Sequence, residues 1–370
     1  MSKDLFHTEN EFMQWLQRLA VPPSRPEWAR SPRIEGGLKL GIGDDAALVA
    51  VGPGQDLILT IDMSIEGVHF SHRLHPADAV GHRALARSLS DVAAMAGVPR
   101  YVLVSLALSK RVRRDWISGF YHGLQALARR FGVQLAGGDT AMLSGRTFID
   151  VLVAGEVPKG KALRRSGARA GDAIFVSGRL GLSALGFRLL QSKAGQALNP
   201  LPKPGRSRRK AQARVPVPLA MEALRAHLYP EPQCALGRLL SKQSMASALI
   251  DLSDGLSSDL ARLCTASGVG ARLWAAKIPG PNLPGAAASL QLALHGGEDY
   301  QLLFTVPQRE ASRLAHKFRG RPLYQIGEIE ASQGIRLVMP EGKVHTLKPE
   351  GWDYFRQGLA RRILYRSFPG

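Results

Sequence analysis

Segments with the patterns of strands and of helices alternate along most of this chain. In its first half, alternating β-rich stretches predict strands, and apolar residues spaced three and four apart predict helices. The strands are expected at 56–62, 101–108 and 147–157, with helices at 77–96 and 114–132, the last one stopped by Gly132. This alternation is typical of the α/β class.

The alternation resumes after a stretch rich in glycine, proline and basic residues between 155 and 172. We therefore expect two domains, 1–155 and 156–370. The second domain begins with a strand at 172–178 and a helix at 181–191. A proline-rich segment at 194–218 is expected to be a long loop inserted in this domain. A further helix is expected at 5–20, followed by a loop over 21–36.

Charge and composition narrow the classes of partner. The chain has 370 residues, is 45% hydrophobic and carries a net charge of +19, which suggests nucleic acid, an acidic membrane surface or phosphorylated metabolites as partners. Seven of the basic residues and no acid lie between Lys193 and Arg214. No aromatic residue lies between Phe187 and Tyr229 to stack on bases, so we favour a solvated loop over a nucleic-acid site.

Two sequence features bear on the compartment. Cys234 and Cys264 are the only cysteines, which fits a reducing compartment rather than a disulfide framework. The first twenty residues lack a basic segment followed by an apolar run, and no stretch reaches eighteen apolar residues. A soluble cytoplasmic protein is expected.

The stretch GGDT at 137–140 has two interpretations. The two glycines and the polar pair after them suit a turn. They also suit a site where backbone N–H groups approach a phosphate and Asp139 holds a metal ion beside it. From the stretch alone we expect the turn.

Aspartates recur in the same setting, at the end of a strand or in a loop with glycine or serine. The segments are GIGDDAAL (41–48), TIDMSIEGVHF (60–70), LSDVAAM (89–95), GGDT (137–140), IDLSDGLSSDL (250–260) and HGGEDYQLLF (295–304). Each alone could be a helix cap or a strand end. Together they predict bound Mg²⁺, because crowded carboxylates repel one another unless cations neutralise them.

Other common sites are absent from the sequence. There is no G-x-x-x-x-G-K-[ST] loop, no dinucleotide-binding fingerprint between a strand and a helix, no zinc-ligand spacing and no G-x-S-x-G.

In this order, the aspartate segments resemble the thiamine-monophosphate kinase family. IEGVHF and HGGEDYQLLFTV are the most specific pieces, and IGEI and GWDYF extend the likeness to about residue 355. The aspartate loops alone are shared with aminoimidazole ribonucleotide synthetase and selenophosphate synthetase. The resemblance implies a two-domain α/β (α+β) synthetase-like fold. Its N-terminal half-barrel would pair with that of a second copy in a homodimer, beside a C-terminal α/β domain.

The resemblance also implies the reaction and the site. The enzyme would be a kinase that transfers phosphate from ATP to thiamine monophosphate with several Mg²⁺ ions, and K⁺ stays open as a further cofactor. The implied metal ligands are Asp45, Thr60, Asp62, Asp91, Asp139, Asp251 and Asp254, of which Asp139 and Asp254 would be catalytic. Gly138, Asp139, Arg165, Ser253 and Tyr121 would contact the nucleotide. His69, Glu298 and Trp352 would hold the thiamine phosphate.

The sequence departs from the family pattern at three places, and two alternative functions stay open. Ile61 stands where the family has a hydroxyl residue, Ala141 and Met142 follow GGDT in place of the usual residues, and VPVP at 215–218 is the nearest match to a family proline motif. One alternative is a sister synthetase acting on a purine intermediate or selenide. The other is a nucleotide- or nucleic-acid-binding protein without catalysis that uses the 193–214 run.

Overall fold

The structure is a computed structural model that describes residues 38–40, 48–49, 52–192, 215–283, 285–314 and 317–352. The chain divides into two compact units. The first comprises the residues up to Val92 together with Ala96–Ala162, and the second Ala93–Met95 together with the residues from Leu163 onward. The domain boundary at 155/156 stays a prediction. The helix expected at 5–20, the loop at 21–36, Asp45 and the basic run 193–214 lie outside the described residues.

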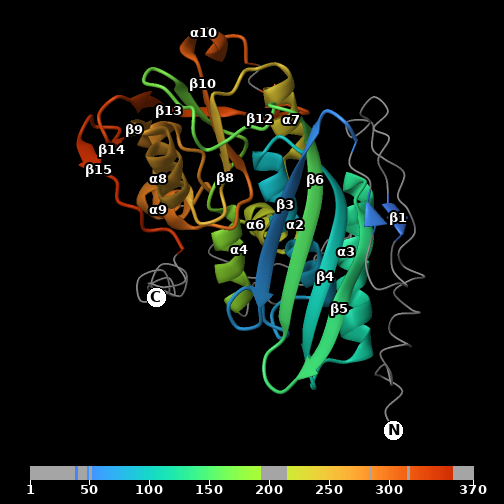
Figure 1. Cartoon of the computed structure of the whole chain (residues 1–370). Helices are drawn as coiled ribbons and strands as arrows, with labels where there is room; N and C mark the ends of the chain where they lie inside the picture. Colours follow the sequence, from blue (N-terminus) through green and yellow to red (C-terminus); the bar gives the residue numbers. More distant parts are fainter. Residues whose placement is uncertain are drawn as a thin grey trace. The chain divides into compact units, whose positions relative to one another are not determined.

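The first unit is a four-stranded sheet with helices on one face (Figure 1). The sheet order is β3 (Gln55–Ile65), β6 (Phe148–Pro158), β4 (Val98–Ser109) and β5 (Gln134–Leu143). β4 and β5 are parallel and the other neighbours antiparallel. The helices are α2 (Ala77–Ala94) and α3 (Arg114–Phe131), and a short pair, β1 (Leu38–Leu40) and β2 (Leu48–Val49), precedes them. These elements confirm the strands and helices predicted for 56–157, including the stop of α3 at Gly132.

β3 shows why one face of this sheet is covered and the other is open. Ile58 and Ser64 are buried, whereas Leu59 and Ile61, on the opposite side of the strand, are 62% and 59% exposed. Side chains alternate across a strand, so one set packs toward α2 and α3 and the other faces outward. Leu57 and Met63 extend the outward apolar stripe.

The turn expected at GGDT is wrong, because residues 137–140 lie inside β5 and pair with β4 throughout. Parallel pairing continues through both glycines after a register shift between Val102 and Leu103. A Cβ on Gly138 would lie 2.0 Å from the Val104 carbonyl oxygen. The glycine therefore allows β5 to approach β4 closely.

The second unit is built on a seven-stranded mixed sheet. Its order is β15 (Val344–Thr346), β14 (Gly334–Val338), β9 (Gly270–Trp274), β13 (Tyr324–Glu330), β7 (Ala173–Val176), β10 (Leu302–Val306) and β8 (Ala248–Asp251). The helices are α4 (Leu182–Gln191), α6 (Val217–Leu228), α7 (Cys234–Lys242), α8 (Leu256–Ser267), α9 (Ala286–His295) and α10 (Gln308–Ala311). A strand pair, β11 (Lys317–Phe318) and β12 (Arg321–Pro322), lies outside the sheet.

The apolar core of this unit forms where α8 packs on the sheet, with Leu260 and Leu263 among buried strand residues such as Ile250 and Leu303. The strand at 172–178 and the helix at 181–191 are confirmed as β7 and α4. The loop predicted for 194–218 ends earlier than expected, because α6 begins at Val217 with Pro218 in its first turn, a position that proline tolerates in a helix.

In the part of the chain that the structure describes, no helix combines the length and apolar character needed to cross a bilayer.

Candidate metal and phosphate site

In the first unit, three of the predicted metal ligands form a group between β3 and α2, held by separate hydrogen bonds. Thr60 Oγ1 donates to Asp91 Oδ2 at 2.5 Å, and Ser88 Oγ donates to Asp62 Oδ2 at 3.0 Å. Arg87 Nη2 lies 3.6 Å from Asp62 Oδ1. Thr60 and Asp62 alternate to the side of β3 that faces the helices, and residues 87, 88 and 91 lie within one turn of α2.

Ile61 points away from this group. Its side chain is 59% exposed on the outward stripe of β3, whereas Thr60 and Asp62 are half-buried on the other side. A side-chain hydroxyl at this position would therefore face outward, and only the backbone of residue 61 is shared with the group. Ala141 and Met142, the second departure, are exposed residues of β5.

Gly138 lies in the same cross-strand row as Asp62. The row runs from Asp62 to Val151 of β6, then to Val104 of β4 and Gly138 of β5. Asp139 is the next residue along β5 and therefore does not belong to the row that carries Asp62.

Asp139 belongs to a neighbouring row with a second carboxylate. It pairs with Ser105, which pairs with Asp150 of β6. Asp139 is exposed, and its Oδ1 accepts a hydrogen bond from the Thr140 N–H at 2.8 Å. Burial and the charge of Asp62 raise the pKa of Asp150. The row begins at Met63 of the outward stripe, so Asp150 and Asp139 lie on the sheet face opposite Asp62. Within the first unit, the structure therefore does not bring Asp139 together with Thr60 and Asp62.

His69 is held as a neutral imidazole. Its Nδ1 accepts a hydrogen bond from the Ile65 N–H at 3.0 Å, so the ring proton of the neutral form is on Nε2. Burial, followed by the charges of Arg87 and Arg83, lowers the pKa of His69 to about 3. These three residues and Phe70 line one small pocket of the first unit. An Nε2–H donor among cations suits an anionic ligand.

Tyr121, predicted to contact the nucleotide, lies in the core of the first unit. It is 1% exposed on α3, and its ring stands edge-on to Phe120 at 5.2 Å. Burial raises the pKa of its hydroxyl.

In the second unit, three predicted segments far apart in sequence converge on the loop between β8 and α8. The Glu298 N–H donates to the Ser253 carbonyl at 2.7 Å, and the Trp352 N–H donates to the Asp254 carbonyl at 2.9 Å. Asp251 is buried at the end of β8, two residues before Ser253. The backbone thus joins the predicted metal, nucleotide and thiamine-phosphate residues of this unit.

The segment at 297–300 is backbone-strained. Glu298 and Tyr300 have φ values of 57° and 48°, which side-chain-bearing residues rarely adopt. Glu298 Oε2 lies 3.8 Å from His227 Nδ1, on α6. Strain of this kind is found where the surrounding structure holds a functional group in place.

An arginine and a second aspartate fix Asp254. Arg262 Nη2 lies 2.5 Å from Asp254 Oδ2, and Arg262 Nη1 lies 2.6 Å from Asp259 Oδ1. Asp259 is fully buried and accepts from the N–H groups of Asp254 and Gly255, both at 3.0 Å. Burial, followed by the charge of Asp254, raises the pKa of Asp259 to about 7.

Gly351 allows Trp352 to reach this loop. A Cβ at Gly351 would lie 2.1 Å from the Asp254 carbonyl oxygen. The Gly351 N–H also donates to Ser258 Oγ at 3.0 Å, which ties the segment to the first turn of α8.

Arg165 lies at the other end of α8. Its carbonyl accepts from Ser267 Oγ at 3.0 Å, and its side chain is exposed. α8 has 12 residues. At 1.5 Å per residue, the backbone of Arg165 is roughly 18 Å along the helix from the Asp254 loop.

Sequence reasoning missed several polar residues of these clusters, among them Arg87, Asp150, His227, Arg262 and Asp299. Asp299 is buried and accepts from the N–H groups of Gly181 (2.6 Å) and Ser183 (3.2 Å) at the start of α4. Its place in HGGEDYQLLF was the available signal. No sequence signal pointed to His227, since only the fold brings α6 beside Glu298.

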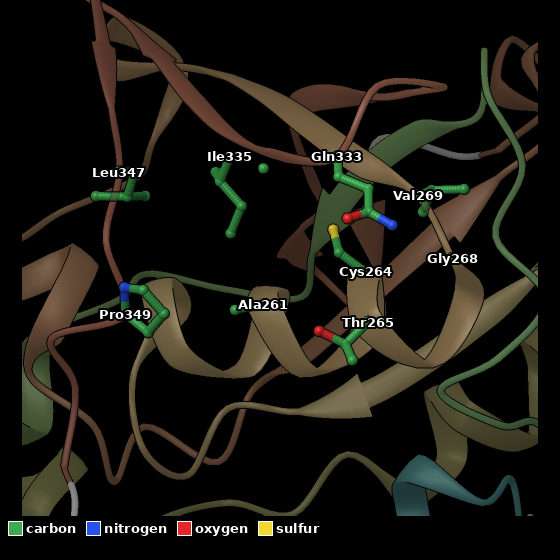
Figure 2. A pocket seen from close by; sticks show the side chains of 10 residues that line it. Ala261, Cys264, Thr265, Gly268, Val269, Gln333, Ile335, Leu347 and Pro349 are labelled. Carbon is green, nitrogen blue, oxygen red and sulfur yellow. The ribbon is translucent and has the colours of Figure 1, made fainter.

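A pocket of about 240 Å³ opens in the second unit, away from the predicted residues (Figure 2). Ala261, Cys264 and Thr265 of α8 and Ile335, Leu347 and Pro349 line much of it. None of the predicted site residues belongs to its lining, so it adds nothing to the candidate site.

The donor set fits Mg²⁺. Among the described residues, the predicted ligands offer only carboxylate and hydroxyl oxygens, which this hard cation prefers. In those same residues, no three Asp, Glu, His or Cys side chains gather closely enough to hold a metal alone. Mg²⁺ is commonly bound by one or two carboxylates together with substrate phosphates, so this arrangement suits a metal that arrives with a phosphate.

Comparison with known proteins gives the family. The family model "AIR synthase related protein, N-terminal domain" matches residues 43–157, and its C-terminal-domain counterpart matches residues 169–340. The thiamine-monophosphate kinase of Salmonella typhimurium is 36% identical over 336 residues, which cover 88% of this chain and 94% of that protein.

Two solved structures share this fold. The crystal structure of thiamine-monophosphate kinase from Stenotrophomonas maltophilia is 34% identical with a TM-score of 0.69, over 83% of this chain and 92% of that one. AaThiL complexed with AMPPCP and TMP is 31% identical with a TM-score of 0.67, over 85% and 92% of the two chains. The predicted two-domain α/β fold is confirmed, and the chain belongs to the thiamine-monophosphate kinase family of phosphate-transferring enzymes.

Proposed function

We propose that this enzyme phosphorylates thiamine monophosphate to thiamine diphosphate with ATP, the final step of thiamine diphosphate synthesis, in the cytoplasm. The observation that carries the proposal is the convergence of Ser253, Asp254, Glu298 and Trp352 on one loop through backbone hydrogen bonds. A relative that binds the ATP analogue AMPPCP together with TMP supports the same substrates.

The metal-binding residues of the proposal are Asp45, Thr60, Asp62, Asp91, Asp139, Asp251 and Asp254. When bound, Mg²⁺ neutralises phosphate charge that would otherwise oppose the transfer. The protein orients two of these ligands by hydrogen bonds, Asp91 by Thr60 and Asp62 by Ser88. K⁺ stays a prediction without further support.

Gly138 and Ser253 would contact the nucleotide phosphates through the backbone or a hydroxyl. Tyr121 and Arg165 have less support, because the first is buried in the core and the second lies at the far end of α8 from the Asp254 loop. The exposed guanidinium of Arg165 would have to act from that end.

Substrate recognition uses complementary groups in the proposal. His69 offers a neutral Nε2–H to a phosphate oxygen, Glu298 offers a negative charge to the thiazolium cation, and Trp352 offers an aromatic face. An oxygen of the substrate phosphate attacks the γ-phosphorus of ATP as the bond to ADP breaks in line. The attacking oxygen is already ionised near neutral pH, so no general base is required.

We further propose that the protein is a homodimer. Leu57, Leu59, Ile61 and Met63 leave an apolar stripe 48–62% exposed along β3, on the sheet face opposite α2 and α3. A contiguous apolar stripe of this kind is typical of a protein interface. A second copy would cover the stripe with its own sheet.

The test is an assay of ADP release with ATP, Mg²⁺ and thiamine monophosphate, with the product identified by mass. Thiamine and an aminoimidazole precursor are run in parallel. Thiamine diphosphate formed from the monophosphate alone is the expected result. Product from the aminoimidazole precursor instead would move the enzyme to a sister synthetase.

Replacing one carboxylate oxygen tests the metal assignment. Asp254→Asn is expected to lower kcat by about 100-fold or more, because the amide removes charge that the metal requires. Glu328→Gln, an exposed carboxylate on β13, is the matched control and should keep wild-type turnover. Near-normal kcat of Asp254→Asn at saturating Mg²⁺ would contradict the assignment.

A further inference from the structure

Two of the proposed metal ligands are engaged by an arginine from the helix that follows them in the sequence. Asp62 pairs with Arg87 of α2 at 3.6 Å, and Asp254 pairs with Arg262 of α8 at 2.5 Å. The two carboxylate side chains are similarly shielded, at 22% and 19% exposed. The same device thus occurs once in each unit.

Each of these aspartates also has a second carboxylate within electrostatic reach. Asp150 precedes Val151, the cross-strand partner of Asp62, and Asp259 accepts a hydrogen bond from the Asp254 N–H at 3.0 Å. Shielded like charges oppose folding unless a cation lies beside them. In protein without metal, the guanidinium groups are the cations that the structure places there.

We propose that Arg87 and Arg262 are resident counter-ions that occupy Asp62 and Asp254 in metal-free enzyme and compete with Mg²⁺ for them. They are positioning residues that set the metal affinity of the site while keeping the metal-free protein folded. The inference rests on the metal ligation proposed above.

Arg262 keeps one ion pair when the Asp254 carboxylate leaves it to bind a metal ion. Its Nη1 stays 2.6 Å from Asp259 Oδ1, and Asp259 in turn holds the N–H groups of Asp254 and Gly255. Arg87 is anchored among the lining of the His69 pocket, where it is 13% exposed. Exchange of the carboxylate therefore does not require either helix to move.

The experiment measures Mg²⁺ binding to the full chain by calorimetry, once without nucleotide and once with ATP present, together with the melting temperature with and without Mg²⁺. In Arg87→Leu and Arg262→Leu, the Kd for Mg²⁺ is expected to fall by about fivefold. This factor corresponds to roughly 1 kcal/mol, the free energy of one competing ion pair that the substitution removes. The melting temperature should fall without Mg²⁺ and recover toward wild type at saturating Mg²⁺.

Arg272→Leu is the matched control. Arg272 is 44% exposed, as is Arg262, and pairs with Glu330 at 2.6 Å outside the proposed site. Its loss should leave the Kd for Mg²⁺ unchanged. It should also lower the melting temperature equally with and without the metal, as a merely structural pair does.

An unchanged or weaker Mg²⁺ affinity in both site variants would overturn the inference and leave the proposed function standing. Wild-type protein that binds no Mg²⁺ with or without ATP would overturn the metal ligation itself. If a leucine variant does not fold, Arg87→Gln and Arg262→Gln are measured in its place, with the same direction expected and the same result overturning the inference.

Discussion

At the scale of single residues, the environment rather than the residue type decides which histidines of the first unit carry charge. His69 and His75 each accept a backbone N–H on Nδ1, from Ile65 and Ser71. Burial and the charge of Arg83 lower the pKa of both to about 3. Both rings are therefore neutral at physiological pH, and His69 can donate only through Nε2.

A pH dependence of stability follows. The folded pKa of His75 lies below its ordinary value of 6.5, so the unfolded chain takes up the proton first as the pH falls. The stabilisation is complete above about pH 6.5 and is lost toward pH 3. The free energy of unfolding, measured by urea denaturation, falls when the pH is lowered from 7 to 5. In His75→Asn this fall should be smaller than in the wild type by about 2 kcal/mol.

An unaltered slope in His75→Asn would show that the His75 ring gains its proton in the folded protein as well.

At the scale of elements, β5 combines a structural and a functional demand in one segment. Its glycines were expected in a turn and instead lie in a strand that pairs with β4. Close backbone approach explains Gly138, and the Asp139 side chain that follows is exposed on the sheet face opposite Asp62, where it would serve the proposed metal. Strand pairing and metal ligation do not compete, because pairing uses backbone N–H and C=O groups and ligation uses a side chain.

The neighbouring glycines allow a matched comparison. Gly138→Ala places a Cβ 2.0 Å from the Val104 oxygen and should lower the free energy of unfolding by about 1–3 kcal/mol. Gly137→Ala meets only Leu103 Cδ2 at 3.7 Å and should be nearly neutral. Equal effects in urea denaturation would contradict the close approach of β5 to β4.

At the scale of the whole molecule, the open face of the first unit's sheet predicts self-association. Ile61→Lys puts a charge in the apolar stripe and should shift the protein to monomer, measured by sedimentation velocity, because burying that charge in an interface is unfavourable. Val344→Lys, a residue 54% exposed on β15, is the control and should leave the mass unchanged. A wild-type monomer at assay concentration would contradict the dimer.

The class of fold and the family follow from local patterns in the sequence. Local periodicity fixes which segments become strands and helices, as it did for β3, α2 and α3, because alternation and the helical repeat are properties of neighbouring residues. The aspartate motifs gave the family for the same reason, since each is a contiguous run.

The surroundings of those residues depend instead on contacts between segments that are distant in the sequence. The pairing of GGDT within β5 depends on β4, whose partner residues lie 34 positions earlier in the sequence, as in Val104 and Gly138. The arginines on Asp62 and Asp254, the placement of His227 beside Glu298 and the burial of Tyr121 depend on how helices pack. Contacts between distant segments leave no local pattern, so the charges that tune the proposed site could be seen only once the chain was folded.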